Sequence, residues 1–132
     1  MKTFISSLVL FLVVTIFVTA NTVFLRNIFD EISDLMKTLP KTLEQTNYLS
    51  EKDLKKHEET LKKIEKLWKK HEEYIYITLE HSAAGRFTEY FLPAKEYFLS
   101  RDFPSYLASL ETAKDILEQF ETNEGVSFEN IF

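Results

Sequence analysis

The sequence predicts an all-α protein: an N-terminal transmembrane helix that continues into an antiparallel bundle of three to four helices. This class rests first on an uncharged, largely apolar run over residues 4–25. It rests next on apolar residues at every seventh position of residues 54–75, which is typical of packed helices. Helix breakers are also few, with two Gly and three Pro in 132 residues. We therefore divide the chain into a membrane anchor, residues 1–26, and a helical bundle domain, residues 27–132.

The charge balance and the missing cysteine exclude several functions. Lys and Arg number 16 and Asp and Glu number 21, so the net charge is −5. Nucleic-acid binding needs a basic surface, and we therefore expect no nucleic-acid partner. The absence of cysteine excludes disulfides, thiol nucleophiles, Cys-ligated zinc and a lipid anchor attached to cysteine.

The N-terminal run has the length of a membrane span. Residues 4–25 carry no charge, Lys2 precedes them and Arg26 follows them. A helix needs about 20 apolar residues to cross the hydrocarbon core of a bilayer. Two alternatives are a signal peptide cleaved near Ala20, after an apolar core at Leu8–Val18, and the buried helix of a soluble protein. We favour the anchor because apolar character continues past Ala20 into an amphipathic helix.

The expected location is the cytoplasmic membrane, crossed once, with residues 4–25 in contact with the lipid bilayer. Basic residues lie on both sides of the span, so they give little help with the topology. The signal-like pattern favours a cytoplasmic amino terminus and an extracytoplasmic domain. Secretion after cleavage near Ala20 is the alternative.

The residues after the span predict an amphipathic helix, because apolar residues recur at steps of three and four. The stripe consists of Leu25, Ile28, Phe29, Ile32, Leu35, Met36 and Leu39. Pro40 disfavours helical backbone at the preceding residue and marks a kink or the end of this helix. We expect residues 41–49 to form a polar connector with a helical turn around Thr42–Gln45.

The next helix begins after Ser50. Ser50 and Asp53 have the spacing of a capping box at a helix N-terminus. Leu54, Leu61, Trp68 and Ile75 follow at intervals of seven, each with a partner three residues later, at His57, Ile64, His71 and Thr78. These are the a and d positions of one packed seam. The segment "YIYITL", residues 74–79, alternates like a strand, but we predict helix because the seven-residue repeat continues through it.

An aromatic helix is predicted to start near Ser82. Its stripe is Phe87, Tyr90, Phe91, Ala94, Tyr97 and Phe98. Pro93 should kink this helix, since proline lacks an N–H and clashes with the preceding turn. The aromatic residues are numerous for so small a bundle, and we expect most of them in the core, with some facing a partner or the membrane headgroups.

The last helix is predicted to begin after Asp102, which resembles an N-cap with Pro104 in the first turn. Its apolar residues are Leu107, Leu110, Ala113, Ile116, Leu117 and Phe120. We expect Gly125 to end the regular structure. The apolar tail that closes the chain, with Asn130, Ile131 and Phe132 at its end, should dock on the bundle.

The pentapeptide "KKHEE" occurs at Lys55–Glu59 and again at Lys69–Glu73. The copies are 14 residues apart, so His57 and His71 lie about 21 Å apart along one helix face and cannot share a metal ion. Neither copy has the second histidine, four residues on, that a zinc-protease motif requires. The repeat therefore indicates a solvated helix face, with His71 in the seam and His57 partly exposed near the helix start.

Trp68, His71, Ile75 and His81 form the candidate site. His81 follows His71 by 10 residues, and both side chains could face the bundle without touching. One interpretation is a packing cluster that fixes the register of the helices, and the other is a ligand or metal pocket in the bundle. The sequence has no Gly-rich phosphate loop and no Gly-x-Ser-x-Gly elbow, so we expect no enzyme, no catalytic residue and no cofactor.

Four segments of the chain are "LWKKHEEYI", "LEHSA", "SRDFPSYLASLETAKDIL" and the closing "ENIF". In this order they resemble the DUF4363 family, small bacterial proteins with a membrane segment and a helical domain of unknown function. The matching positions are Trp68, His71, Ile75, His81, Asp102, Leu110 and residues 130–132. Pro93 and the aromatic segment around it depart from the family pattern. The resemblance implies no activity, but it favours an integral membrane protein as a partner.

The expected function is therefore a membrane-anchored, non-enzymatic helical interaction module that docks on a membrane protein partner. The anchor would raise the local concentration of the module at the membrane. The alternative is a ligand- or metal-sensing bundle centred on Trp68, His71 and His81. A homo-oligomer is compatible with either, and the sequence names no biological process.

Overall fold

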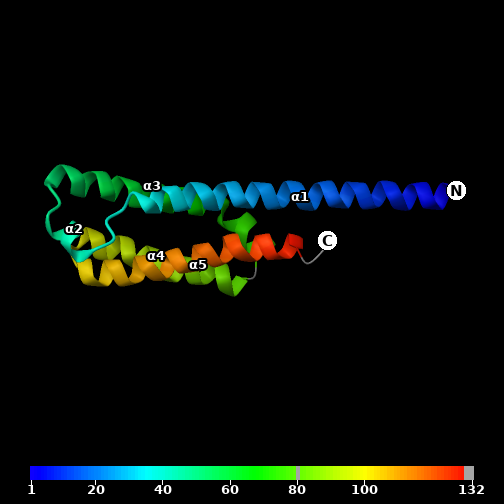
Figure 1. The fold of residues 1–132 in the computed structure, drawn as a ribbon. Helices are drawn as coiled ribbons and strands as arrows, with labels where there is room; N and C mark the ends of the chain where they lie inside the picture. Colours follow the sequence, from blue (N-terminus) through cyan, green and yellow to red (C-terminus); the bar gives the residue numbers. More distant parts are fainter. Residues whose placement is uncertain (80, 130–132) are drawn as a thin grey trace.

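Five α-helices and no strand make up the part of the chain that the computed structural model describes, residues 1–79 and 81–129. The side chains of residue 81 and of residues 123–129 lie outside that description. The helices are α1 (Lys2–Lys37), α2 (Leu43–Asn47), α3 (Glu51–Thr78), α4 (His81–Leu99) and α5 (Phe103–Glu129) (Figure 1).

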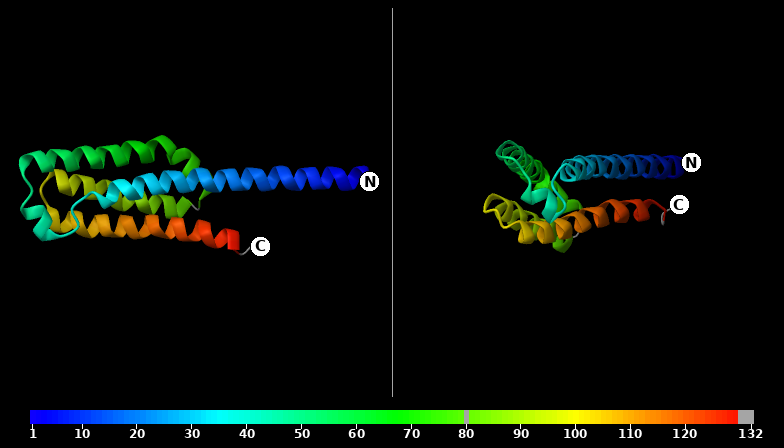
Figure 2. Two further views of the ribbon diagram at one scale, coloured as in Figure 1. Left: turned by 45° about the horizontal axis from the view of Figure 1, so that its top comes forward. Right: turned by 60° about the vertical axis from the view of Figure 1, so that its left-hand side comes forward.

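The four long helices form an antiparallel bundle, which confirms the predicted fold class. Both α1 and α4 pack against α3 and against α5, so α4 lies across the bundle from α1. The short helix α2 packs on α5 at the end of the bundle far from the amino terminus (Figure 1). The first half of α1 extends well beyond the other helices, and the carboxyl end of α5 lies toward the same side (Figure 2). The bundle therefore has one end beside the projecting part of α1 and one end away from it.

α1 joins the predicted anchor and the predicted amphipathic helix in one uninterrupted helix of 36 residues. Its C-cap is Thr38, whose backbone N–H bonds to the carbonyl of Leu35 at 3.1 Å. The helix therefore ends just before Leu39 and Pro40, as the restriction on the residue before a proline predicts. Leu39 and Pro40 are both buried, so the turn after α1 is packed into the bundle.

Side chains cap the two helices that follow. Thr42 accepts a hydrogen bond from the backbone N–H of Gln45 at 3.2 Å and starts α2, where the sequence predicts a helical turn. Ser50 accepts one from the N–H of Asp53 at 3.1 Å and donates its own hydroxyl to the Asp53 carboxylate at 2.6 Å. The hydroxyl of Ser50 is also the main cause that lowers the pKa of Asp53. The predicted capping box at Ser50 is confirmed.

The seven-residue repeat of α3 marks its buried side. Leu54, Leu61, Trp68 and Ile75 are all buried, with exposed fractions of 8% or less, and so is Ile64. α3 continues to Thr78, so the segment that alternates like a strand is helical, as the repeat predicts. The histidines at d positions are different, since His57 and His71 are only half-buried.

α4 runs from His81 to Leu99 and continues through Pro93. Proline leaves the carbonyl four residues earlier without its helical partner. That residue is Glu89, which is exposed, so water can satisfy the carbonyl. The buried side of α4 carries most of the predicted aromatic stripe: Phe87, Phe91, Ala94 and Phe98 are at most 1% exposed.

The turn between α4 and α5 is a Schellman motif. The N–H of Arg101 bonds to the carbonyl of Phe98 at 3.1 Å, and the N–H of Asp102 bonds to that of Tyr97 at 2.9 Å. The motif requires a left-handed residue, and Arg101 supplies it with φ of 64°. The Asp102 side chain then accepts from the N–H of Ser105 at 3.3 Å, which confirms the predicted N-cap.

The prediction that Gly125 ends the last helix is wrong, because α5 continues to Glu129. A single glycine inside a helix costs about 1 kcal/mol relative to alanine, which is less than the packing of a long helix can supply. The predicted docking tail, Asn130, Ile131 and Phe132, lies outside the described residues.

Candidate functional site

The two halves of α1 differ in what covers them. Among the described helices, α1 is long and apolar enough to cross a membrane, with a mean hydropathy of 2.5 over its most apolar 18 residues. Only 6% of that window is buried, so the bundle leaves it uncovered. Further along the same helix, Leu25, Ile28, Phe29, Ile32 and Met36 are at most 4% exposed. At the boundary between the two halves, an uncovered apolar helix meets the packed bundle, and we take this boundary as the candidate functional site.

Aromatic and polar contacts between α1 and α3 mark this boundary. The Tyr74 hydroxyl donates a hydrogen bond to the side-chain oxygen of Asn21. The Phe24 ring meets the rings of His71 and Tyr74 edge-on, with centroids 5.7 and 5.0 Å apart. Phe24 is still 44% exposed, so this junction cluster of Asn21, Phe24, His71 and Tyr74 is accessible from outside.

Trp68 packs against α4, on another side of α3. Its indole N–H donates to the Thr88 hydroxyl at 3.0 Å, and its ring lies 4.3 Å from that of Phe87. The Phe87 ring in turn stacks on Phe91 at 5.4 Å. These contacts join α3 to α4, and Trp68 itself is buried, with 2% of its surface exposed.

The predicted cluster is therefore divided between two helix pairs. Trp68 contacts α4 whereas His71 contacts Phe24 of α1. Ile75 is fully buried. His81 is the first residue of α4, and its side chain lies outside the described part of the structure. Among the described residues no group of three or more His, Asp or Glu side chains could hold a metal ion.

The second histidine of the repeat, His57, lies near the other end of α3. Its ring meets Phe98 of α4 edge-on at 6.3 Å. Its Nδ1 atom is buried and has no hydrogen-bond partner. Burial lowers the pKa of His57, with the nearby charge of Lys56 acting in the same direction and that of Asp53 opposing it. The two copies of the pentapeptide thus place their histidines against different helices, in different surroundings.

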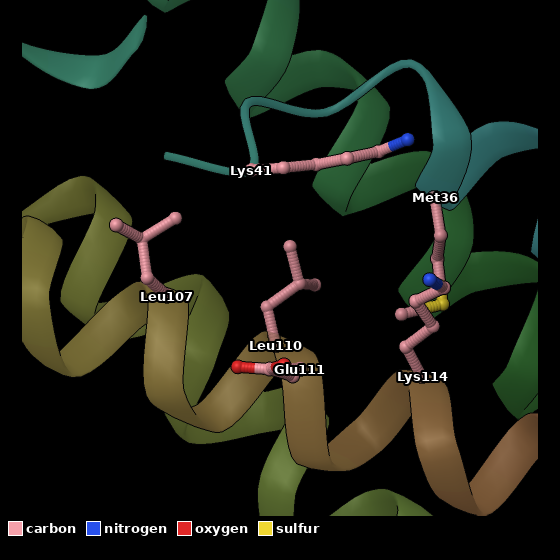
Figure 3. Close-up of a pocket in the computed structure, with 6 residues that line it drawn as sticks. All are labelled: Met36, Lys41, Leu107, Leu110, Glu111 and Lys114. Carbon is pink, nitrogen blue, oxygen red and sulfur yellow. The ribbon is translucent and has the colours of Figure 1, made fainter. Parts of the chain in front are cut away.

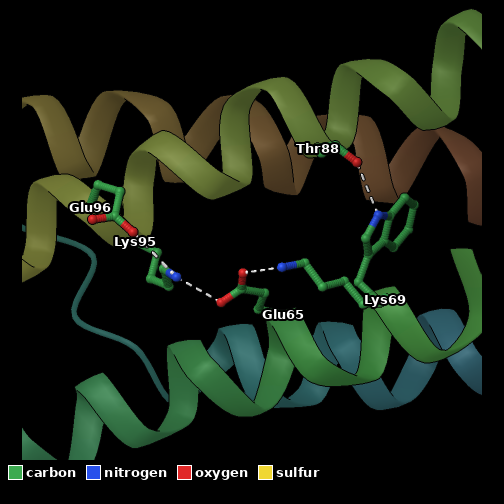
Figure 4. A network of polar contacts seen from close by, with 6 residues as sticks. Glu65, Lys69, Thr88, Lys95 and Glu96 are labelled. Atoms are coloured by element: carbon green, nitrogen blue, oxygen red, sulfur yellow. Dashed lines mark hydrogen bonds and ion pairs between the residues drawn. The ribbon is translucent and has the colours of Figure 1, made fainter.

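A charged network ties α3 to α4 on the outside of the bundle. The Glu65 carboxylate accepts hydrogen bonds from Lys69 at 2.8 Å and from Lys95 at 2.7 Å (Figure 4). The lysine contacts lower the pKa of Glu65, and Glu65 raises the pKa of Lys95. A second pair, Arg101 with Glu58 at 2.9 Å, joins the same helices near the turn after α4. These charges fix how the helices pack and do not converge on one pocket.

Two pockets lie around the turn that follows α1. The smaller, of about 150 Å³, is lined by Met36, Lys41, Leu107, Leu110, Glu111 and Lys114 (Figure 3). The figure shows Leu107 and Leu110 rising from α5 toward Lys41, with Met36 at the side. The other, of about 390 Å³, lies between this turn, α2 and the start of α3, and His57 is part of its lining. Both are at the end of the bundle away from the projecting half of α1.

The sequence analysis missed Asn21, Phe24 and Tyr74 as members of a common cluster. The available signal was the interruption of the apolar run by Asn21 just before the amphipathic stripe begins. An amide at that place needs a partner, and a tyrosine near the end of an antiparallel neighbouring helix can supply one. The pairing itself depends on which helices are neighbours, and no local pattern states this.

The fold and the junction define a class of protein: a small antiparallel helical bundle built onto one half of a long helix, whose other half is apolar and projects beyond the bundle. Comparison with families places the chain more closely. The model of a family described as "Domain of unknown function (DUF4363)" matches residues 23–131, and the chain belongs to this family. No curated protein and no solved structure matched the chain.

Proposed function

We propose that the protein is a membrane-anchored, non-enzymatic interaction module. In this proposal α1 crosses the cytoplasmic membrane once, the bundle lies on its extracytoplasmic side, and the bundle docks on an integral membrane protein. The observation that supports it is the continuity of α1, a single helix that contributes both the uncovered apolar half and part of the bundle core. Because no flexible linker separates the two halves, the bundle would be held in one orientation at the membrane surface.

A fixed orientation favours docking on a neighbour in the same membrane. Two proteins in one membrane meet at a high effective concentration, so a modest contact surface is sufficient. The outer face of α4 offers such a surface, with Tyr90 and Tyr97 exposed by 36% and 37% at a spacing of seven residues. Tyrosine is enriched at protein interfaces because it combines a large apolar ring with a hydrogen-bonding group.

Site-specific crosslinking in native membranes tests the docking. A photoreactive amino acid replaces Tyr90 or Tyr97 in the full chain, and an exposed residue of α3, Lys63, carries it in the control. We expect one adduct with a membrane protein from the two α4 positions and none from position 63. Equal adducts from all three positions, or none, would contradict docking through α4.

The mass of the intact protein tests the anchor. A retained anchor predicts that the protein extracted from membranes has the mass of the full chain. Loss of about the first 20 residues, the length of a cleaved signal segment, would instead mean secretion. The buried stripe of α1 begins at Leu25, so cleavage near Ala20 would leave that stripe intact.

A further inference from the structure

Ile77 lies in the last turn of α3 and is 81% exposed. Its neighbour Ile75 is fully buried, so the last turn of α3 has one apolar side chain in the core and one pointing outward. A single exposed isoleucine on a soluble protein needs no explanation. Ile77 is different because of where it lies relative to the apolar half of α1.

The contacts of Tyr74 set the level of this turn along α1. Tyr74 touches Asn21 and Phe24, and α3 runs antiparallel to α1. Helices rise 1.5 Å per residue, so Ile77 is level with about residues 18–21 of α1. These residues belong to the uncharged run, and the bundle leaves most of them uncovered.

The end of α5 reaches the same level independently. The ring of Phe120 packs on that of Phe29 with centroids 5.4 Å apart. Glu129 ends α5 nine residues later, so by the same rise the helix ends level with about residue 20 of α1. Both α3 and α5 therefore end on the side of the projecting half of α1, and α5 reaches further along α1 than α3 does (Figure 2).

Polar residues of α1 near this level mark the expected surface of the bilayer. Asn21 and Thr22 interrupt the apolar run there. Glu73, one helical turn before Ile77, is exposed, and by the same rise it lies further than Ile77 from the projecting half of α1. Val23 and Phe24, exposed by 53% and 44%, extend the apolar surface of α1 up to α3. Aromatic residues such as Tyr74 are favoured at membrane interfaces, where the ring is apolar and the hydroxyl is wet.

We infer that the last turn of α3 contacts the lipid bilayer, with Ile77 at the boundary between the headgroups and the hydrocarbon. The bundle then rests on the membrane through this end and does not stand away from it. This inference rests on the proposed membrane anchoring by α1. It adds a second lipid contact, made by the bundle itself, which fixes the tilt of the bundle relative to the membrane.

Spin labelling of the full chain in lipid vesicles tests the inference. The chain has no cysteine, so Ile77→Cys, Tyr48→Cys and Val13→Cys each accept a single nitroxide label. All three side chains are exposed, by 81%, 85% and 56%, so the labels leave the core intact. Tyr48 lies next to α2 at the far end of the bundle, and Val13 lies in the middle of the apolar run. The vesicles contain phosphatidylcholine and phosphatidylglycerol, and collisions with oxygen and with a water-soluble nickel chelate report the depth of each label.

We expect a ratio of oxygen to nickel collisions at position 77 several times that at position 48 and below that at position 13. A label at position 77 as open to nickel as the one at position 48 would overturn the inference while position 13 still supports the anchor. Ile77 would then be an exposed residue available for contact with a protein partner. Low collision rates with both reagents at position 77 would also overturn it, since they mean contact with protein. Free access of nickel to position 13 would overturn the anchor and this inference together.

Discussion

The two halves of α1 share one backbone and differ in what their side chains face. Residues 4–20 are apolar on all sides and uncovered, and their hydroxyls bond back to the helix, as Thr15 does to the carbonyl of Phe11 at 2.8 Å. The inner half is apolar on one side only, with Phe29 in the core and Asp30 in water. The outer half thus satisfies its own polar groups, as a helix in lipid must, whereas the inner half depends on its neighbours.

This contrast shows that helical backbone alone does not decide what the two halves of α1 contact. The backbone is helical along all 36 residues. The distribution of charge around the axis separates a surface suited to lipid from a surface suited to a protein core. Changes in the outer half should therefore affect membrane attachment, and changes in the inner half should affect the stability of the bundle.

The largest expected effect is loss of bundle stability on truncation in the inner half. Phe29→Ala removes a fully buried ring that packs on Phe120 and should lower the free energy of unfolding by about 3–5 kcal/mol. Attachment to the membrane should not change. Urea unfolding of the full chain in detergent micelles measures it, because Trp68, the one tryptophan of the chain, lies in the bundle and reports on it alone.

Phe17→Ala is the matched control, since Phe17 lies on the same helix but is 74% exposed. It should leave the unfolding free energy of the bundle unchanged within about 0.5 kcal/mol. Equal losses from the two variants would mean that the outer half also packs on the bundle, and the contrast between the halves would fail.

The next effect concerns attachment. Val13→Arg places a charge in the middle of the uncharged run and should cost about 2.5–3.5 kcal/mol of membrane insertion. We expect much of the protein to leave the membrane fraction on alkaline extraction, whereas Val13→Leu should stay. The bundle should unfold at the same urea concentration in both variants, because Val13 lies in the half of α1 that the bundle leaves uncovered. Full retention of the arginine variant would argue against a span.

Much of the fold could be predicted because its signals are local. Ser50 and Asp102 are capping residues recognisable from their neighbours alone, and the seven-residue repeat identifies the buried side of α3. The ends of helices were harder. A proline at 93 and a glycine at 125 weaken helices locally, but both helices continue, since packing along a whole helix outweighs one weak position.

The candidate site was predicted less well. Trp68 and His71 share a seam by spacing, yet three residues correspond to about 60° around a helix. That angle is enough to direct Trp68 to Thr88 on α4 and His71 to Phe24 on α1. Which neighbour each side chain meets depends on the arrangement of four helices. The sequence repeat carries no information on that arrangement, so Asn21 and its contact with α3 were also missed.

A smaller effect is expected where the turn after α1 meets α5. The Tyr106 hydroxyl donates to the carbonyl of Pro40 at 3.0 Å, and both residues are buried. Tyr106→Phe keeps the ring and leaves that carbonyl without a donor, which should cost about 1–2 kcal/mol of unfolding free energy. Tyr97→Phe, an exposed tyrosine on α4, should change it by less than about 0.5 kcal/mol. If Tyr106→Phe also changed the unfolding free energy by less than about 0.5 kcal/mol, water would have to reach the Pro40 carbonyl. The inner end of α1 would then be held less firmly.

The smallest effect separates the halves by charge. Residues 4–25 contain no titratable side chain, so any loss of stability in acid must arise in the bundle. Glu65 is one source, because it accepts from Lys69 and Lys95 and is 17% exposed. Glu65→Gln should lower the unfolding free energy at neutral pH by about 0.5–1 kcal/mol, since the network is still in contact with water.

The stabilisation by Glu65 should depend on pH. The lysine contacts lower the pKa of Glu65 in the folded state below the ordinary value of 4.5. Its contribution is therefore complete above pH 4.5 and is lost as the pH falls through the lower, folded pKa. The difference between the native chain and Glu65→Gln should shrink over that acid range. Glu59→Gln, an exposed change on the same helix, should show no such trend. A difference that stays constant in acid would mean that packing, and not charge, makes Glu65 stabilising.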